Sequence, residues 1–232
     1  MRRSRYRHKS TLPALLGTLL LVLAGIFYGL HNIHAKTTQP VGCDNAILGI
    51  KLTQKTSFVD LHKLKKAGIS FIYLNATQGR SYFDDKYLTY RSQVIGTNLA
   101  FGTIVSYSYQ STPLQHFNYL KKMTDLDTGT LPILIENTKK PDLAYVKSMA
   151  KFVYLLAINN KKAMVQVSRK YRKYFVKGTE FCGTGTKANS RFWRYTTNGR
   201  VKNISELDDG VTMYAYLGTV LKYRQEYGEL TQ

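Results

Sequence analysis

Residues 58–77, FVDLHKLKKAGISFIYLNAT, join a helix-like segment to a strand-like segment at Gly68. Before the glycine, apolar residues recur at the spacing of one face of an α-helix, and glycine is favoured where a helix ends. After the glycine, ISFIYLNAT has the β-branched and aromatic content of a buried strand. This stretch therefore predicts a helix followed by a strand, the repeating unit of an α/β fold. The apolar face of the predicted helix consists of Val59, Leu61, Leu64 and Ala67.

The rest of the chain continues this alternation of strand and helix. Such spacing is typical of βαβ units and predicts a parallel sheet, either open or closed into a barrel. In these folds the chemistry takes place at the carboxyl ends of the strands. Further strands are predicted at 47–52, 99–109, 131–136, 163–168 and 191–196, and further helices at 86–95, 112–123 and 141–159. The residues at the strand ends are Lys51, Asn75, 106–109, Glu136, Ser168 and Tyr195.

One strand end carries a carboxylate. In GTLPILIENTKK, residues 129–140, a turn leads into a short apolar strand that ends at Glu136. A carboxylate in this position suggests general acid/base chemistry. It is either half of a catalytic pair or the remnant of one.

The first 35 residues predict insertion into a membrane. Residues 1–10, MRRSRYRHKS, are basic, and the 20 residues that follow are uncharged. A secretory signal has an apolar core of ~7–15 residues, whereas a membrane-spanning helix needs ~20. The candidate cleavage site IHA, ending at Ala35, has Ile33 where a small residue is preferred. We therefore expect an uncleaved anchor, with a cleaved signal peptide and a secreted protein as the alternative.

These features divide the chain into four parts. We assign a cytoplasmic basic leader to 1–11, a transmembrane anchor or signal peptide to 12–31, a polar linker to 32–46 and one domain to 47–232. The positive flank of such an anchor stays in the cytoplasm. A single-pass membrane protein with an extracellular C-terminal domain is the expected arrangement.

The composition predicts a polyanionic partner. The chain carries 34 Lys and Arg against 14 Asp and Glu, a formal net charge of +20. Five of the bases precede residue 36, so the remainder holds 29 bases against 14 acids, a charge of +15. Nucleic acid, an anionic membrane or an acidic wall polymer would each be attracted to this charge. Because the domain is expected outside the cytoplasm, the cell envelope is the predicted partner and nucleic acid is not.

Cysteine and histidine spacing gives no sign of a metal site. Cys43 and Cys182 are the two cysteines, and their separation leaves open whether they pair. Neither a CxxC nor an HExxH motif occurs, so neither a metal nor a cofactor is expected.

Four segments then follow one another in a distinctive order: GIKLTQKTS (49–57), LNATQGRSYFD (74–84), LPILIENT (131–138) and FWRYTTNGRVKNISELDDGVTMYAYLG (192–218). They resemble the motifs GIDVSxxQG, KATEG, DxE and WQYTxxGRVxGI…VDLN of the glycoside hydrolase family 25 lysozymes. Members of this family are N-acetylmuramidases that cut the sugar backbone of bacterial peptidoglycan. The resemblance implies an α/β fold, a (β/α) barrel of the family 25 type, here preceded by one N-terminal transmembrane helix. The segment between 178 and 191 is shorter than is usual in the family, so the barrel is either complete or lacks one strand.

The resemblance breaks at the carboxylates. The family's first-strand Asp falls on Lys51, and the Asp of its last motif falls on Thr212. The DxE pair falls on Glu136 and Thr138, or on Leu134 and Glu136 if the alignment shifts by two residues. Either register leaves one carboxylate where the family has two. Two further departures are Gln78 for the Glu of KATEG and Arg194 for the Gln of WQY.

These losses bear directly on catalysis. Cleavage of a glycosidic bond needs one group to protonate the leaving oxygen and a second to stabilise or attack the sugar centre. Lys51 places positive charge where positive charge develops in the transition state. A lysine placed beside Glu136 would also hold that carboxylate ionised, the wrong state for a general acid. We therefore expect a catalytically impaired domain, a pseudoenzyme, that binds wall glycan or anionic wall polymer and retains Glu136 as its catalytic candidate.

Two alternatives remain open. The first is an active N-acetylmuramidase that hydrolyses peptidoglycan with Glu136 as the acid and Asp208 or Asp209 as its partner. The second is a scaffold that uses the family 25 barrel to bind another envelope protein.

Aromatic and basic residues are the candidates for binding. Tyr107, Trp193 and Tyr195 are predicted to contact substrate, because aromatic rings can pack against sugars. Their alternative is a place in the core, where strand aromatics often lie. The basic segment RKYRKYFVKG, residues 169–178, either binds a phosphate-rich polymer or forms a solvated helix face.

Overall fold

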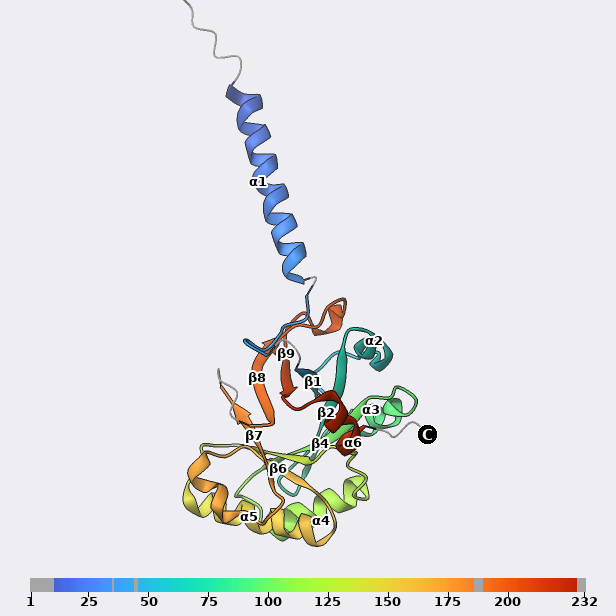
Figure 1. Cartoon of the computed structure of the whole chain (residues 1–232), viewed down its shortest axis with the longest axis vertical. Helices are drawn as coiled ribbons and strands as arrows, with labels where there is room; N and C mark the ends of the chain where they lie inside the picture. Colours follow the sequence, from blue (N-terminus) through green and yellow to red (C-terminus); the bar gives the residue numbers. More distant parts are fainter. Residues whose placement is uncertain (1–10, 35, 44–45, 186–189, 229–232) are drawn as a thin grey trace, which may run out of the picture.

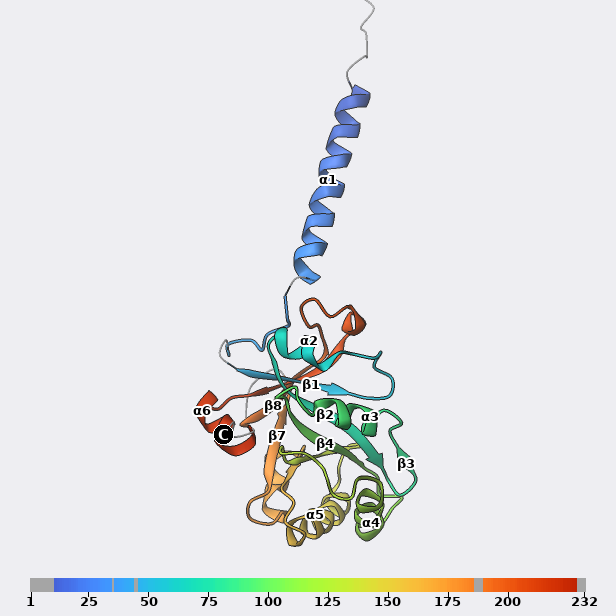
Figure 2. The ribbon, with the colours of Figure 1, turned by 90° about the vertical axis from the view of Figure 1, so that its right-hand side faces the viewer.

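The computed structural model describes residues 11–34, 36–43, 46–185 and 190–228. The predicted basic leader lies outside these ranges, apart from its last residue. The first element is helix α1 (Thr11–His34), which stands apart from the folded domain (Figures 1 and 2). Its large apolar side chains between residues 15 and 28 are exposed. In the described part of the chain, no helix combines the length and the hydrophobicity required to cross a membrane.

Eight strands of the described chain close into a barrel (Figure 1). They follow the order β1-β9-β8-β7-β6-β5-β4-β2, and a pairing between β1 and β2 closes the ring. Neighbours are parallel except at β9, which is antiparallel to both β1 and β8. The short strand β3 (Tyr82–Phe83) pairs with the end of β2. The barrel strands are β1 (Ile47–Leu52), β2 (Ile69–Gln78), β4 (Ala100–Tyr107), β5 (Ile133–Asn137), β6 (Ala163–Val165), β7 (Glu180–Thr184), β8 (Phe192–Gly199) and β9 (Val211–Tyr216).

Strand β7 lies in the short segment that left one barrel strand in doubt. It pairs in parallel with β6 through Met164 and Glu180, and with β8 through Cys182 and Phe192. The alternative of a barrel that lacks one strand is therefore wrong, while the predicted α/β barrel is confirmed. The strand reads EFCGT, which lacks the run of large apolar residues that marked the other strands.

Helices cover the outside of the barrel and one of its ends. Helix α4 begins with a capping box in which Thr112 and Gln115 each accept the other's backbone N–H. Helices α4 and α5 lie side by side beneath the barrel (Figures 1 and 2). Helix α6 packs Tyr223 and Tyr227 against aromatic rings in the barrel interior. The helices of the domain are α2 (Leu61–Lys66), α3 (Tyr87–Val94), α4 (Pro113–Thr124), α5 (Leu143–Ile158) and α6 (Val220–Tyr227), with the 3₁₀ turns η1 (Arg169–Tyr174) and η2 (Ser205–Leu207).

Alternation along each strand separates an inner core from an outer one. On β4, Ile104 faces the barrel interior, whereas Val105 and Tyr107 pack outward with residues of α4 and α5. On β5, Leu134 lies inside and Ile135 outside. Every second residue of a strand therefore points toward the barrel axis, and the last inward residue of each strand reaches the mouth of the barrel.

The described part of the predicted linker is attached to the domain. The Thr38 amide donates to the Arg200 carbonyl at 2.9 Å, and the Arg200 amide donates to Thr38 Oγ1 at 2.9 Å. The Lys202 amide donates to Thr37 Oγ1 at 3.1 Å, and the Tyr195 hydroxyl donates to the Thr38 carbonyl at 2.7 Å. Residues 37–38 are thus attached by hydrogen bonds to β8 and to the turn that follows it.

Candidate functional site

Glu136, near the end of β5, is held by side chains from other strands. Lys51 Nζ on β1 lies 2.6 Å from Glu136 Oε2, and the Tyr214 hydroxyl on β9 donates to Oε1 at 2.9 Å. Arg194 Nη1 on β8 lies 3.9 Å from Oε1, at the outer limit of an ion pair. The side chains of Glu136 and Lys51 are only 12% and 19% exposed, so their ion pair is largely shielded from solvent. Each carboxylate oxygen of Glu136 therefore has its own donor.

The fold explains why these residues meet. Glu136 is two residues beyond the inward-facing Leu134, and it lies opposite Ser106 of β4. Arg194 of β8 is paired directly with Tyr214 of β9, so both side chains point the same way. Closure of the barrel through β1 and β2 brings Lys51 to the same mouth.

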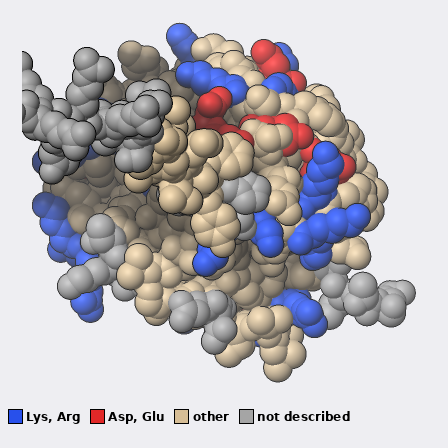
Figure 3. Space-filling view, turned by 90° about the horizontal axis from the view of Figure 1, so that it is seen from above, with Lys and Arg blue, Asp and Glu red and all other residues tan. Residues whose placement is uncertain are grey.

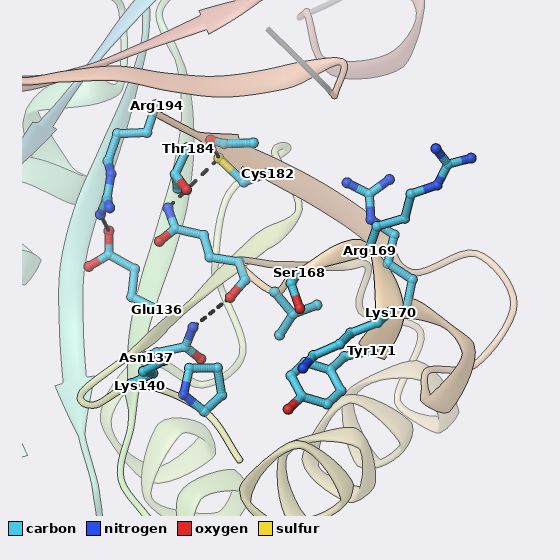
Figure 4. A pocket seen from close by; sticks show the side chains of 15 residues that line it. Glu136, Asn137, Lys140, Ser168, Arg169, Lys170, Tyr171, Cys182, Thr184 and Arg194 are labelled. Carbon is cyan, nitrogen blue, oxygen red and sulfur yellow. Dashed lines mark hydrogen bonds and ion pairs between the residues drawn. The ribbon is translucent and has the colours of Figure 1, made fainter. Parts of the chain in front are cut away.

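Glu136 lines an open groove of about 1080 Å³. Figure 4 shows Arg169, Lys170 and Tyr171 on one side of this groove and Glu136 and Arg194 on the other. Among its described lining residues the groove has five cations and one carboxylate, a net charge of +4. The cations are Lys140, Arg169, Lys170, Arg172 and Arg194.

The other acids named in the sequence analysis do not line this groove. Asp209 lines a separate cavity of about 230 Å³, together with Glu206, Lys51 and Thr212. Asp208 is exposed and lines neither cavity. Among the groove residues that the structure describes, Glu136 is thus the one carboxylate.

Asp84 is a carboxylate that the sequence analysis did not single out. It is buried and accepts hydrogen bonds from Asn75 Nδ2 at 3.1 Å, the Gln54 amide at 2.9 Å and the Lys86 amide at 3.1 Å. These bonds tie the loop after β1 to the start of α3. The donors come from strand β2, from the loop after β1 and from the start of α3, so Asp84 organises the rim of the barrel.

Two predicted sugar-binding aromatics are in the core. Tyr107 has no exposed surface; its ring stacks on His116 at 4.3 Å and its hydroxyl is 2.8 Å from Ser148 Oγ. Trp193 is 2% exposed, and its indole N–H donates to the Gly185 carbonyl at 2.8 Å. The prediction that these two rings contact substrate is corrected here, because neither offers a free face to a sugar.

Tyr195 is half-buried on the same outer face of β8 as Trp193. Its ring centre is 5.8 Å from that of Trp193, and its hydroxyl holds the linker at Thr38. Tyr195 therefore contacts the linker rather than the groove. The aromatic that lines the groove is Tyr171, with Lys170 Nζ 4.9 Å from its ring centre. Tyr171 lies in the basic segment 169–178, which was recognisable by its composition and not by a position at the end of a strand.

Burial shapes the titration of groups around Glu136. Burial, and then the nearby Glu136 carboxylate, raise the pKa of Tyr214 well above its ordinary value, so Tyr214 remains a hydrogen-bond donor. Burial raises the pKa of Cys182 to about 12. Cys182 and Cys43 are both free thiols. Within the described chain, no group of three or more His, Cys, Asp and Glu side chains is placed to hold a metal ion.

The comparisons with known proteins agree with this architecture. The family model described as glycosyl hydrolases family 25 matches residues 52–204, more than half of the chain. The chain therefore belongs to glycosyl hydrolase family 25. A search of curated protein sequences found no match.

Solved structures of the family share the fold at low sequence identity. A family 25 glycosyl hydrolase from Bacillus anthracis is 14% identical with a TM-score of 0.65, over 83% of this chain and 97% of that one. A bacterial lysozyme from Streptomyces coelicolor is 17% identical with a TM-score of 0.61, over 77% and 95% of the two chains. A family GH25 lysozyme from Aspergillus fumigatus is 14% identical with a TM-score of 0.59, over 78% and 98%.

The chemistry available at the mouth differs from that of a two-carboxylate site. Glycoside hydrolysis uses carboxyl groups ~5–9.5 Å apart across the scissile bond. Here the carboxylate of Glu136 is bonded to an ammonium and a phenol, and the groove around it is positive. This arrangement favours binding of an anion over stabilisation of a cationic sugar centre.

Proposed function

We propose that this chain is a membrane-anchored, extracytoplasmic family 25 domain that binds at bacterial peptidoglycan and has lost most or all of its hydrolytic activity. Membership of the family supports the peptidoglycan setting. The contacts of Glu136 support the loss of activity, and the exposed apolar side chains of α1 support the membrane anchor.

The ion pair between Lys51 and Glu136 carries the proposal of catalytic loss. An acid catalyst must hold a proton and release it to the leaving oxygen, a contribution of ~10²–10⁴-fold in rate. Here Lys51 Nζ lies 2.6 Å from Oε2 and the Tyr214 hydroxyl donates to Oε1, so both oxygens of Glu136 are already occupied as hydrogen-bond acceptors. The same ammonium would also oppose the positive charge that develops on the sugar.

Sequence and exposure support the anchor. Residues 11–30 are uncharged and follow a basic leader, the pattern of an anchor whose C-terminal domain is extracellular. The apolar side chains of α1 between residues 15 and 28 are exposed and belong to none of the hydrophobic cores of the barrel. Exposed apolar surface on this scale marks a site of membrane or protein contact. A secreted, cleaved form is the alternative.

An active muramidase is the second candidate, and one observation favours it. Asp209 lines a cavity together with Lys51, so a moderate shift of the loop before β9 would bring the Asp209 carboxylate closer to Lys51. In this alternative Glu136 is the acid and Asp209 supplies the second carboxylate.

One assay separates these proposals. The full chain, in neutral detergent, is incubated with purified peptidoglycan, and both retained protein and released reducing ends are measured. Retention without reducing ends is the result expected. Release of reducing ends above the blank would favour the muramidase, and absence of both would favour the scaffold.

Fractionation of cells tests the anchor: recovery in the membrane is expected, whereas recovery in the medium with a new N-terminus near Lys36 would favour cleavage.

A further inference from the structure

Cations line both sides of the groove beside Glu136 (Figure 4). Arg169 and Lys170 are exposed on η1, Lys140 is exposed after β5, and Arg194 is 30% exposed on β8. These cations come from three separate parts of the chain and line one groove. Their convergence is set by the barrel, since the strand ends and η1 surround the same mouth.

Internal ion pairs among the described residues leave the groove cations available to a ligand. Glu136 is neutralised mainly by Lys51, so Arg194 at 3.9 Å does not form a short hydrogen bond with it. Arg172 is partly engaged, because it donates to Ser190 Oγ at 2.9 Å and lies over the Phe181 ring at 4.8 Å. In a 3₁₀ turn, side chains three residues apart lie on one face, so Arg169 and Arg172 are presented together. Guanidinium groups bind phosphate through two parallel N–H donors.

The polar residues of the groove suit hydroxyl groups between the anions. Asn137 does not contribute here, because its Nδ2 donates to the Gln166 carbonyl and its Oδ1 is buried. Ser168 and Thr184 add two exposed hydroxyls to the lining. The aromatic of the groove, Tyr171, has the Lys170 ammonium near its ring. The lining thus offers donors and acceptors but little free aromatic surface for a neutral sugar.

From these features we infer that the groove binds a phosphodiester-linked polymer of polyols or sugars, with Arg169, Lys170 and Arg194 contacting its phosphates. The inference deepens the proposed function, on which it rests, by assigning the chemical class of the wall component that is bound. The replacements noted in the sequence, Lys51 for an Asp and Arg194 for a Gln, then act together. They turn the mouth of a hydrolase barrel into a receptor for anions.

A binding titration tests this inference. The full chain in neutral detergent is titrated with lipid-free poly(glycerol phosphate), with polyglutamate of equal charge and with a neutral chitin oligosaccharide. We expect the phosphate polymer to bind more tightly than the other two and to weaken as salt rises, since exposed charges are screened over ~8 Å at physiological ionic strength. Equal affinity for polyglutamate, or no binding of the phosphate polymer at low salt, would overturn the inference.

Paired variants separate the groove from the overall charge. The double variant Arg169→Gln with Lys170→Gln removes two exposed groove cations, and Lys63→Gln with Lys66→Gln removes two exposed cations on α2. We expect about a tenfold loss of affinity from the first pair, as for lost charge-assisted hydrogen bonds, and less than about twofold from the second. Equal losses would reduce binding to general basicity and overturn the inference. Because all four residues are exposed, circular dichroism should confirm that both variants fold.

The polymer need not be attached to the wall. Binding of walls before and after removal of their phosphate polymers, compared with binding of vesicles that carry the lipid-linked polymer, identifies the source. Reducing-end release from polymer-free peptidoglycan reports separately on catalysis. The inference and the proposed loss of activity can therefore fail independently.

Discussion

Lys51 is the residue that most clearly separates this barrel mouth from a two-carboxylate site. Its ammonium is the closest group to the Glu136 carboxylate, in a pair of which both members are mostly shielded from solvent. Removal of one partner from a shielded pair leaves the other charge poorly compensated. The pair therefore affects stability as well as chemistry.

We predict that Lys51→Met lowers the free energy of unfolding by about 1–3 kcal/mol, because Glu136 loses its strongest partner while it keeps the Tyr214 hydroxyl. Lys55→Met, at an exposed lysine in the loop after β1, is the matched control and should change it by less than about 0.5 kcal/mol. Denaturant unfolding followed by the fluorescence of Trp193, the single tryptophan, provides the measurement. Equal effects of the two substitutions would contradict the role given to the pair.

The two thiols should differ sharply in reactivity. Cys43 is partly exposed, whereas Cys182 is buried and its pKa is raised by that burial to about 12. The thiolate is the reactive form, so Cys182 should resist alkylation near neutral pH. Mass spectrometry after iodoacetamide treatment should show modification at Cys43 in the native protein, and at Cys182 after denaturation. Rapid native modification of Cys182 would show that the inner side of β7 opens.

At the scale of the elements, the sequence identified most strands and helices but not the direction of their side chains. The apolar runs that became β1, β2 and β5 and the capped segment that became α4 were all recognisable. Tyr107 and Trp193 were misassigned because alternation does not tell which face of a strand lies inside a barrel. Glu136 and Arg194 occupy the inner face of their strands, so their neighbours Ile135 and Trp193 point outward.

Two other elements could not be derived from local patterns. Strand β7 has five residues and is stabilised by its pairing with β6 and β8 rather than by its own composition. The basic segment RKYRKY forms a 3₁₀ turn, and its place beside Glu136 depends on closure of the barrel. Motif spacing pointed to Lys51, Glu136 and Arg194, whereas the convergence of Arg194 and the basic segment on one groove required the tertiary structure.

The attachment of the linker to β8 makes a prediction at this scale. Tyr195→Phe removes the hydroxyl that donates to the Thr38 carbonyl at 2.7 Å, at an expected cost of about 1 kcal/mol. Hydrogen exchange of the Thr38 and Arg200 amides should become faster, because both belong to the same attachment. Tyr109→Phe, at an exposed tyrosine, is the control and should leave those amides unchanged. Unchanged exchange in Tyr195→Phe would show that the remaining bonds suffice.

At the scale of the whole molecule, positive charge and buried tyrosines both have consequences. Lys and Arg are spread around the face seen from the α1 end, while Asp and Glu gather in one sector of it (Figure 3). The groove adds a net charge of +4 among its described residues. The domain is therefore suited to a polyanionic partner.

The tyrosines predict how stability depends on pH. Burial raises the pKa of Tyr87 and of Tyr107 to about 12 in the folded protein, against about 10 in the unfolded chain. The stability that these groups contribute is complete below pH ~10 and is lost as pH rises toward ~12. Tyrosinate absorbance and circular dichroism should therefore change together in this alkaline window. Full ionisation of the tyrosines near pH 10 with native circular dichroism would contradict the burial described.

The most direct test of the central claim is the release of reducing ends from polymer-free peptidoglycan by the full chain, compared with its Glu136→Gln variant. A family 25 lysozyme with both carboxylates serves as the positive control. If Lys51 has disabled the site, the wild-type chain should release no more reducing ends than Glu136→Gln, and both should remain at the level of the blank. Turnover by the wild-type chain that disappears in Glu136→Gln would show that Glu136 still works as a catalytic acid and would contradict the claim.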